Sequence, residues 1–268
     1  MVSLRRERAS SFQKDNLFHV LQYNKKYMAR PTYKELLEAG AHMGHMKRKW
    51  NPKMQPYIFM ERKGIHIIDL NRTAEYMDKA AAALKQVAKS GRKVMFVATK
   101  KQAKENVSRM AREVNMPHVT ERWLGGMMTN FSTIKRSVKK MNNIDKLLAD
   151  ENVTSITKKE RLTLTRERNK LEKVLGGVAN MNRLPAAIFV VDTMHEHIAI
   201  KEAKKLGIKI FGIVDTNSDP TLVDFPIPAN DDASKSINII TGYMSEVIKE
   251  GLEERRKMND QKKEAVAS

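Results

Sequence analysis

Cations, aromatic rings and glycines occur together in two short stretches of this 268-residue sequence, residues 42–53 and residues 121–131. Ammonium and guanidinium groups pair with phosphates, aromatic rings stack on nucleobases, and glycines let a backbone approach another surface closely. Residues of these types at this spacing are typical of a surface that contacts RNA. The elements around the two stretches decide whether they could act together.

The first stretch has no apolar period, and it combines two histidines, a tryptophan and four cations around a central glycine. We expect RNA contacts from His42, Gly44, His45, Lys47, Arg48, Lys49, Trp50 and Lys53. A solvated loop is the simpler alternative. The His-x-x-His pair could hold a metal ion, but the chain has no cysteine and no obvious third ligand lies nearby, so we expect no metal. A charged turn between two short strands, residues 57–60 and 65–68, adds Arg62 and Lys63.

The second stretch begins with an arginine beside a tryptophan and continues through a glycine pair. The pair permits positive φ angles and a close approach. We expect RNA contacts from Arg122, Trp123, Gly125, Gly126, Thr129 and Asn130. In the alternative interpretation, Trp123 is a core residue at the end of a strand and the glycines form an ordinary loop.

Two amphipathic patterns of about twenty residues follow, and a capping box of Thr157 and Glu160 opens the second. Thr129 is expected to cap the first. Each pattern has a narrow apolar stripe, and a short polar connector joins them. They predict an inserted, coiled-coil-like antiparallel helical hairpin over residues 127–183. We expect its basic outer face to meet RNA through Lys135, Arg136 and Lys139.

Strands alternate with helices on either side of this hairpin. Continuous apolar runs at residues 94–98, 185–192 and 208–215 are typical of strands buried on both faces. The pattern predicts an α/β fold, a parallel sheet with helices on both faces, the helices including residues 102–114, 196–206 and 231–250. The turn after the first strand lacks the glycine-rich loop of a dinucleotide-binding domain, although Lys100 and Lys101 could hold a phosphate at the next helix N-terminus.

These elements divide the chain into four parts. Residues 30–126 and 184–250 form the globular α/β domain, residues 127–183 the inserted hairpin, and residues 251–268 a polar, frayed tail. Residues 1–29 form an N-terminal extension without a clear repeat. Met28 is a plausible start, because a capping box of Thr32 and Glu35 follows it. We therefore expect the extension to be disordered or a mis-assigned start.

Lysine and arginine outnumber aspartate and glutamate by 50 to 31, which gives a net charge of +19. Residues 184–250 are the exception, because acids outnumber bases there. A basic protein with one acidic region is expected to hold a polyanion on one side, and nucleic acid is the commonest candidate. No run of about 18 apolar residues occurs, so we expect no membrane partner, and the lack of cysteine excludes disulfides.

Carboxylates gather at the ends of the later strands and in the loops beyond them: Asp192, Asp215, Asp219, Asp224, Asp231 and Asp232. Ligands bind at the carboxyl ends of parallel strands, and such carboxylates could hold Mg²⁺ for an enzyme acting on a phosphorylated ligand. The same residues form turns readily, and Asp231 or Asp232 is a good N-cap. With no nucleophile, activated base or phosphate loop nearby, we favour turns and caps, and expect no catalytic residue and no cofactor.

Seven sequence blocks, in the same order and at similar spacing, resemble the bacterial form of the ribosomal protein S2 family. They are Leu37–His45, Lys49–Met54, Phe96–Ala103, Arg122–Phe131, Arg183–Pro185, Asp215–Pro220 and Ile227–Ala233. The resemblance covers residues from about 28 to 251 and leaves residues 1–27 uncovered. Met43 stands where the family usually has an aromatic residue.

The resemblance implies a Rossmann-like α/β domain with the inserted hairpin, and a structural, non-catalytic role in the small ribosomal subunit. It further implies binding to small-subunit rRNA where head meets body, a contribution to assembly and translation, and contacts with neighbouring ribosomal proteins, including protein S1 in bacteria that have it. We expect a cytoplasmic protein on the ribosome that is not a homo-oligomer. The alternatives are an α/β enzyme that uses the acidic strand ends on a phosphate ligand, and an extraribosomal regulator that binds its own messenger.

Overall fold

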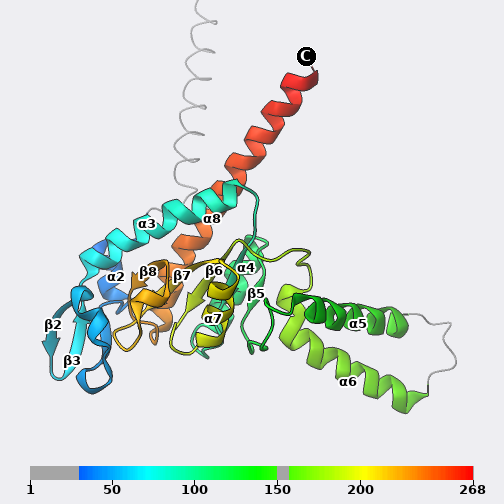
Figure 1. The fold of residues 1–268 in the computed structure, drawn as a ribbon, viewed down its shortest axis with the longest axis horizontal. Coiled ribbons are helices and arrows are strands. Elements are labelled where there is room, and N and C mark those ends of the chain that lie inside the picture. Colours follow the sequence, from blue (N-terminus) through cyan, green and yellow to red (C-terminus); the bar gives the residue numbers. More distant parts are fainter. Residues whose placement is uncertain (1–29, 150–156, 268) are drawn as a thin grey trace, which may run out of the picture.

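The computed structural model describes residues 30–149 and 157–267, and its centre is a five-stranded parallel sheet (Figure 1). The strand order is β5-β4-β6-β7-β8, and every neighbouring pair is parallel. The strands are β4 (Val94–Val97), β5 (His118–Val119), β6 (Ala187–Val191), β7 (Lys209–Val214) and β8 (Phe225–Pro228). All of β4 and β6 is buried, as their continuous apolar runs predict.

Alternate side chains of these strands enter two separate cores. Phe96 and Phe189 belong to the core beneath α3, α4 and α8, whereas Met95 and Ile188 belong to the core beneath α7 and the base of the hairpin. The helices are α3 (Leu70–Lys89), α4 (Lys104–Glu113), α7 (His197–Lys205) and α8 (Ser234–Ala267). The predicted Rossmann-like α/β fold, with helices on both faces of a parallel sheet, is confirmed.

A smaller antiparallel sheet precedes the large one, with the strand order β1-β3-β2. Its strands and the short helices around them are α2 (Tyr33–Glu38), β1 (Met43–Met46), η1 (Lys47–Lys49), η2 (Pro52–Tyr57), β2 (Ile58–Arg62) and β3 (Ile65–Ile68). The predicted capping box of Thr32 and Glu35 opens α2. The predicted β-hairpin is confirmed, whereas β1 lies in a stretch that was expected to be a loop.

The inserted hairpin projects away from the large sheet, with its two helices side by side (Figure 1). They are α5 (Phe131–Ala149) and α6 (Lys158–Leu175), followed by the short helix η3 (Gly176–Val178). Ion pairs join the two helices, with Lys140 Nζ 2.5 Å from Glu167 and Arg168 Nε 2.7 Å from Asp145. The two helices are present as predicted, and their coiled-coil character stays a prediction.

The edge strands β5 and β8 were not predicted, because neither has a long apolar run. β5 has two residues, and β8 contains Pro226 and Pro228, which an edge strand tolerates because one side of it needs no hydrogen bonds. Sequence patterns of this kind resemble loops. Only hydrogen bonding to a neighbouring strand identifies these two segments as strands.

The last helix begins at Ser234 and continues past Gly251 to Ala267, so helical structure extends into the segment predicted as a tail. A Cβ on Gly251 would lie 2.8 Å from the Ala88 methyl, so close packing against α3 explains a glycine inside this helix. The expectation for residues 1–29 concerns residues outside the described part of the chain. Within the described ranges, no helix is both long and apolar enough to cross a membrane.

Candidate nucleic-acid interface

The first basic stretch is held against the carboxyl end of β7. The backbone N–H of His45 donates to the Thr216 hydroxyl at 2.8 Å, and the N–H of Asn51 donates to the Thr216 carbonyl at 2.7 Å. Gly44 lies so close that a Cβ there would be 2.6 Å from the Thr216 methyl carbon. Gly44 therefore allows the backbone to pack closely against Thr216 of the same chain.

The cations of this stretch fall into two groups. Lys47 lies 2.7 Å from Glu61 and Lys53 lies 2.6 Å from Asp219, so carboxylates neutralise both ammonium groups. Arg48 and Lys49 are exposed and form no ion pair with any described residue.

The turn between β2 and β3 carries two more exposed cations, Arg62 and Lys63. Neither forms an ion pair within the described ranges. Lys63 has a φ of 52°, a left-handed conformation that the tight turn to Gly64 requires. Their charges point to a partner outside this part of the chain.

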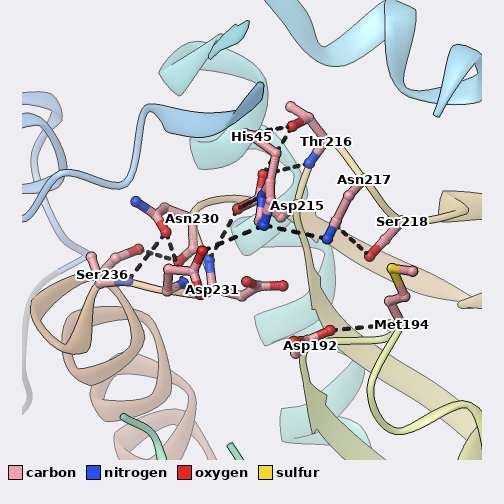
Figure 2. A network of polar contacts seen from close by, with 12 residues as sticks. His45, Asp192, Met194, Asp215, Thr216, Asn217, Ser218, Asn230, Asp231 and Ser236 are labelled. Atoms are coloured by element: carbon pink, nitrogen blue, oxygen red, sulfur yellow. Dashed lines mark hydrogen bonds and ion pairs between the residues drawn. The ribbon is translucent and has the colours of Figure 1, made fainter. Parts of the chain in front are cut away.

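The aromatic side chains of the stretch are partly engaged. Trp50 is half-buried, and its ring centroid lies 4.9 Å from that of His66, with 41° between the ring planes. His42 is also half-buried, and His45 points into a charged cluster (Figure 2). Protein atoms already cover part of each predicted stacking group.

The charged cluster lies where β6, β7 and β8 end (Figure 2). The imidazole of His45 lies 3.1 Å from Asp215 through Nδ1 and 3.4 Å from Asp232 through Nε2. The Lys100 ammonium lies within ion-pair distance of three carboxylates: Asp192 (3.1 Å), Asp231 (2.7 Å) and Asp232 (2.6 Å). The topology thus brings together the strand-end aspartates that the sequence placed far apart.

The pKa values of the cluster reflect this crowding. The hydrogen bond to Asp215 outweighs partial burial and raises the pKa of His45. Burial and the charges of Asp215 and Asp192 raise the pKa of Asp231 to about 7. Although burial opposes it, the three carboxylates raise the pKa of Lys100, which therefore stays charged.

Lys100 does not lie at a helix N-terminus, because α4 begins at Lys104. Its ammonium is neutralised within the chain, whereas Lys101 is exposed. The two lysines therefore do not form the paired phosphate grip that the sequence suggested. Of the two, Lys101 has the charge free for another molecule.

Three side chains of the cluster could hold a cation. Ligand atoms of His45, Asp231 and Asp232 lie within 4.8 Å of one another. The Lys100 ammonium already lies between the two aspartates, so a divalent ion would have to displace it.

The expectation that Asp231 or Asp232 caps the last helix is wrong. The side-chain oxygen of Asn230 accepts from the backbone N–H groups of Asp232 (2.8 Å) and Ala233 (3.1 Å), while both aspartates point to Lys100. The turn prediction is confirmed at Asp219, whose carboxylate accepts from the N–H of Thr221 and caps the short helix η4 (Pro220–Leu222).

The second stretch folds around a carboxylate that the sequence did not single out, that of Glu202 in α7. Glu202 is 8% exposed, and its two oxygens accept five hydrogen bonds. The donors are the Trp123 indole N–H (3.0 Å), the backbone N–H groups of Gly126 (2.8 Å), Met128 (3.0 Å) and Thr129 (3.0 Å), and the Thr129 hydroxyl (3.1 Å). Burial alone would raise the pKa of Glu202, but these hydrogen bonds outweigh it and lower the pKa.

The predicted RNA contacts of this stretch therefore differ in their surroundings. Trp123 is 7% exposed and lies in the core, as the packing interpretation predicts. Gly126 has a φ of 85°, which favours glycine, and Gly125 has open space at its Cβ position. Arg122 is exposed and forms no ion pair with a described residue.

The cap of α5 also differs from expectation. The Thr129 hydroxyl donates to Glu202 and is not the cap. Asn130 precedes Phe131, the first helical residue, and its side-chain oxygen accepts from the hydroxyls of Ser132 and Thr133. The Thr129 hydroxyl is therefore hydrogen-bonded to the Glu202 carboxylate and does not cap α5.

A weak sequence signal for Glu202 does exist. Ala199 and Ala203 lie three residues before and one residue after it in α7, and both are fully buried. Positions three and four apart share a helix face, so Glu202 lies on the same face of α7 as the buried Ala199. An ionised group on a buried face needs several donors.

On the hairpin, the predicted cations again fall into two groups. Lys135 donates to the Asn182 carbonyl at 2.7 Å, and its ammonium lies 5.2 Å from the Phe131 ring centroid. Arg136 and Lys139 are exposed and have no ion-pair partner among the described residues.

Comparisons with known proteins agree on one family. The family model described as ribosomal protein S2 matches residues 36–251. This chain belongs to the ribosomal protein S2 family. The small ribosomal subunit protein uS2 of Cytophaga hutchinsonii is 63% identical over 231 residues, which cover 86% of this chain and 91% of that protein. The uS2 proteins of Bacteroides fragilis and Porphyromonas gingivalis are 60% and 59% identical over 229 residues, 85% of this chain and 82% of each relative.

Ribosomal protein S2 is a structural protein and not an enzyme. The α/β enzyme considered from the acidic strand ends is therefore wrong. In this S2-family chain the strand-end carboxylates neutralise Lys100 and contact the His45 imidazole, which ties β6, β7 and the loop before α8 together.

Proposed function

We propose that this S2-family chain is a structural constituent of the small ribosomal subunit that binds small-subunit rRNA at the junction of head and body. One observation carries the proposal: within the described ranges, a set of exposed cations has no carboxylate partner. Among the predicted contact residues, this set comprises Arg48, Lys49, Arg62, Lys63, Lys101, Arg122, Arg136 and Lys139. Phosphates would supply the missing partners.

The arrangement of these cations favours a large polyanion. The β2–β3 turn and the hairpin lie at opposite ends of the molecule (Figure 1). A small phosphorylated ligand could meet only one end, whereas folded RNA could meet both. Basic surfaces at two separate ends would allow the chain to contact RNA of both the head and the body. This supports the proposed position at the junction of the two.

The other predicted contact residues would shape the interface rather than pair with phosphates. Most have polar atoms or rings that are engaged within the chain, or are glycines that allow tight packing: Gly44, His45, Lys47, Trp50, Lys53, Lys100, Trp123, Gly126, Thr129 and Lys135. His42 is half-buried, and its Nδ1 has no hydrogen-bond partner among the described residues. Gly125 and Asn130 are exposed just before α5 and remain candidates for direct contact.

Neighbouring small-subunit proteins, and protein S1 where it exists, are the proposed protein partners. The relatives' name, small ribosomal subunit protein, supports this assignment. In this proposal the chain is a cytoplasmic ribosomal protein that contributes to assembly and translation, and it is not a homo-oligomer.

Sedimentation of a cell lysate through sucrose gradients tests the proposal. The chain should migrate with the small subunit at moderate salt and dissociate as salt rises, because each phosphate contact steepens the salt dependence. A known small-subunit protein detected in the same fractions is the control. If the chain stayed at the top of a low-salt gradient from growing cells, the ribosomal role would be refuted.

A further inference from the structure

The loop of residues 123–129 has the form of an anion-binding loop, and the anion that it holds belongs to its own chain. The backbone N–H groups of Gly126, Met128 and Thr129 converge on the Glu202 carboxylate at 2.8–3.0 Å. Successive backbone N–H groups around a positive-φ residue form the concavity that binds phosphate in other proteins. Here Gly126, with a φ of 85°, supplies that conformation.

We propose that Glu202 is a positioning residue that locks this loop onto α7 and so fixes the direction in which the hairpin leaves the sheet. The loop ends two residues before α5 begins at Phe131, whereas α7 packs against β7. A hydrogen-bonded tie between the loop and α7 is therefore a tie between the hairpin and the sheet. This inference rests on the proposed function, because the direction matters when both ends contact one RNA.

The tie is strong for two reasons. The carboxylate is 8% exposed, so water does not compete well for its hydrogen bonds. Hydrogen bonds to an ionised acceptor are also about twice as strong as neutral ones. Removing the carboxylate would leave the buried donors of Trp123 and Met128 without partners.

The loop and the start of α5 also pack apolar side chains into the core beneath α7, whereas the other polar contacts of the hairpin base lie elsewhere. Lys135 holds the first turns of α5 to Asn182, which lies in the segment that returns from the hairpin. Gly177 packs against His118 at the other end of the hairpin. The first contact links the two hairpin connections to each other, and the second holds the returning connection to the edge strand. Glu202 holds the connection that enters the hairpin, the loop before α5.

Three variants of the full-length chain test the proposal: Glu202→Ala removes the carboxylate, Glu202→Gln replaces it by an amide of the same size, and Ile198→Ala changes an exposed, uncharged residue of the same helix. Two quantities are measured for each variant, the hydrogen exchange of the amides of Gly126, Met128 and Thr129, and the affinity for transcribed small-subunit rRNA. Sodium formate is then added as a free carboxylate, with sodium chloride at the same concentration as its control.

In Glu202→Ala we expect faster exchange at these amides, unchanged exchange in β6, and a loss of rRNA affinity of about tenfold, because a freed hairpin must be ordered on binding. Formate should restore both quantities and chloride should restore neither. Glu202→Gln should show the same two defects more weakly, because its carbonyl oxygen can still accept some of the hydrogen bonds although its NH₂ group cannot. Ile198→Ala should match the wild type. If Glu202→Ala does not fold, the comparison of Glu202→Gln with the wild type tests the proposal instead.

Unchanged amide exchange in the folded variants would overturn the tie. Faster exchange with undiminished rRNA affinity would overturn the positioning role, and so would an affinity loss that formate does not reverse while it restores the amides. If the wild-type chain itself did not bind the rRNA, the proposed function would fail instead, so the two failures are distinguishable.

Discussion

Charged and polar side chains inside this protein are stabilised in three different ways. Lys100 is surrounded by three aspartates, Glu202 by N–H and O–H donors, and His118 is buried without an ionised partner. The first two stay charged, because their partners stabilise the ionised form. Burial first, and then the positive charge of Arg112, lower the pKa of His118, which favours its neutral form.

The His118 environment predicts a loss of stability in acid. Its pKa is lower in the folded chain than the unfolded value of about 6.5, so the unfolded chain binds the proton first as pH falls. The stability is complete above the unfolded pKa and declines below it, by at most about 1.4 kcal/mol per pH unit. Urea unfolding at pH values of about 7.5 and 5.5 should therefore show a larger loss for the wild type than for His118→Gln. Equal losses would contradict the prediction.

The hairpin is fixed to the sheet at both of its connections. Glu202 holds the entering loop, and η3 holds the return by packing Gly177 against the backbone of β5. Between these points the hairpin helices contact mainly each other, and Met141 and Ile144 of α5 are buried there, whereas Ile134 packs into the core beneath α7. The direction of the hairpin is therefore decided at its base.

Two adjacent glycines test the packing of the returning connection. A Cβ on Gly177 would lie 2.1 Å from the His118 carbonyl oxygen, whereas one on Gly176 would meet only the Glu172 side chain at 3.4 Å. Gly177→Ala should lower the unfolding free energy by about 3 kcal/mol, because a backbone atom cannot move aside easily. Gly176→Ala should be neutral or slightly stabilising. Urea unfolding of both variants measures the two changes in unfolding free energy. Equal changes would show that the base of the hairpin is not tightly packed.

Across the whole molecule, charge is sorted by position. The sheet interior is apolar, the strand ends hold paired charges, and the predicted contact cations without described partners include residues of the first basic stretch, of the β2–β3 turn and of the hairpin. Such sorting lets a strongly basic chain fold without strong self-repulsion, because part of its positive charge is already neutralised. The remaining cations determine how the chain meets a polyanion.

Neighbouring lysines of α5 test which cations meet RNA. Lys139 has no described ion pair, whereas Lys140 pairs with Glu167 across the hairpin. Lys139→Ala should reduce the slope of log affinity for rRNA against log salt by about 0.7–0.9, the value for one lost phosphate contact. Lys140→Ala should leave that slope nearly unchanged. If the two variants had equal slopes, an unpaired cation in this structure would not mark an RNA contact.

Long, periodic signals in the sequence were enough to determine the main elements. The apolar runs of β4, β6 and β7 predict buried parallel strands, because a strand covered on both faces has no polar side. The stripes of α5 and α6 predict a helix pair, and two capping boxes mark helix starts that the structure confirms. The seven motif blocks also pointed to the S2 family, which the family match confirms.

Only the tertiary structure decided which charged groups remain available. Lys100 resembles a phosphate-binding lysine, and Trp123 resembles a stacking residue, until the fold places three aspartates around the first and Glu202 beside the second. Glu202 lies more than seventy residues beyond Trp123 in the sequence. Local sequence cannot report such pairing, because an ion pair or hydrogen bond depends on distance in space, which the strand order and helix packing set.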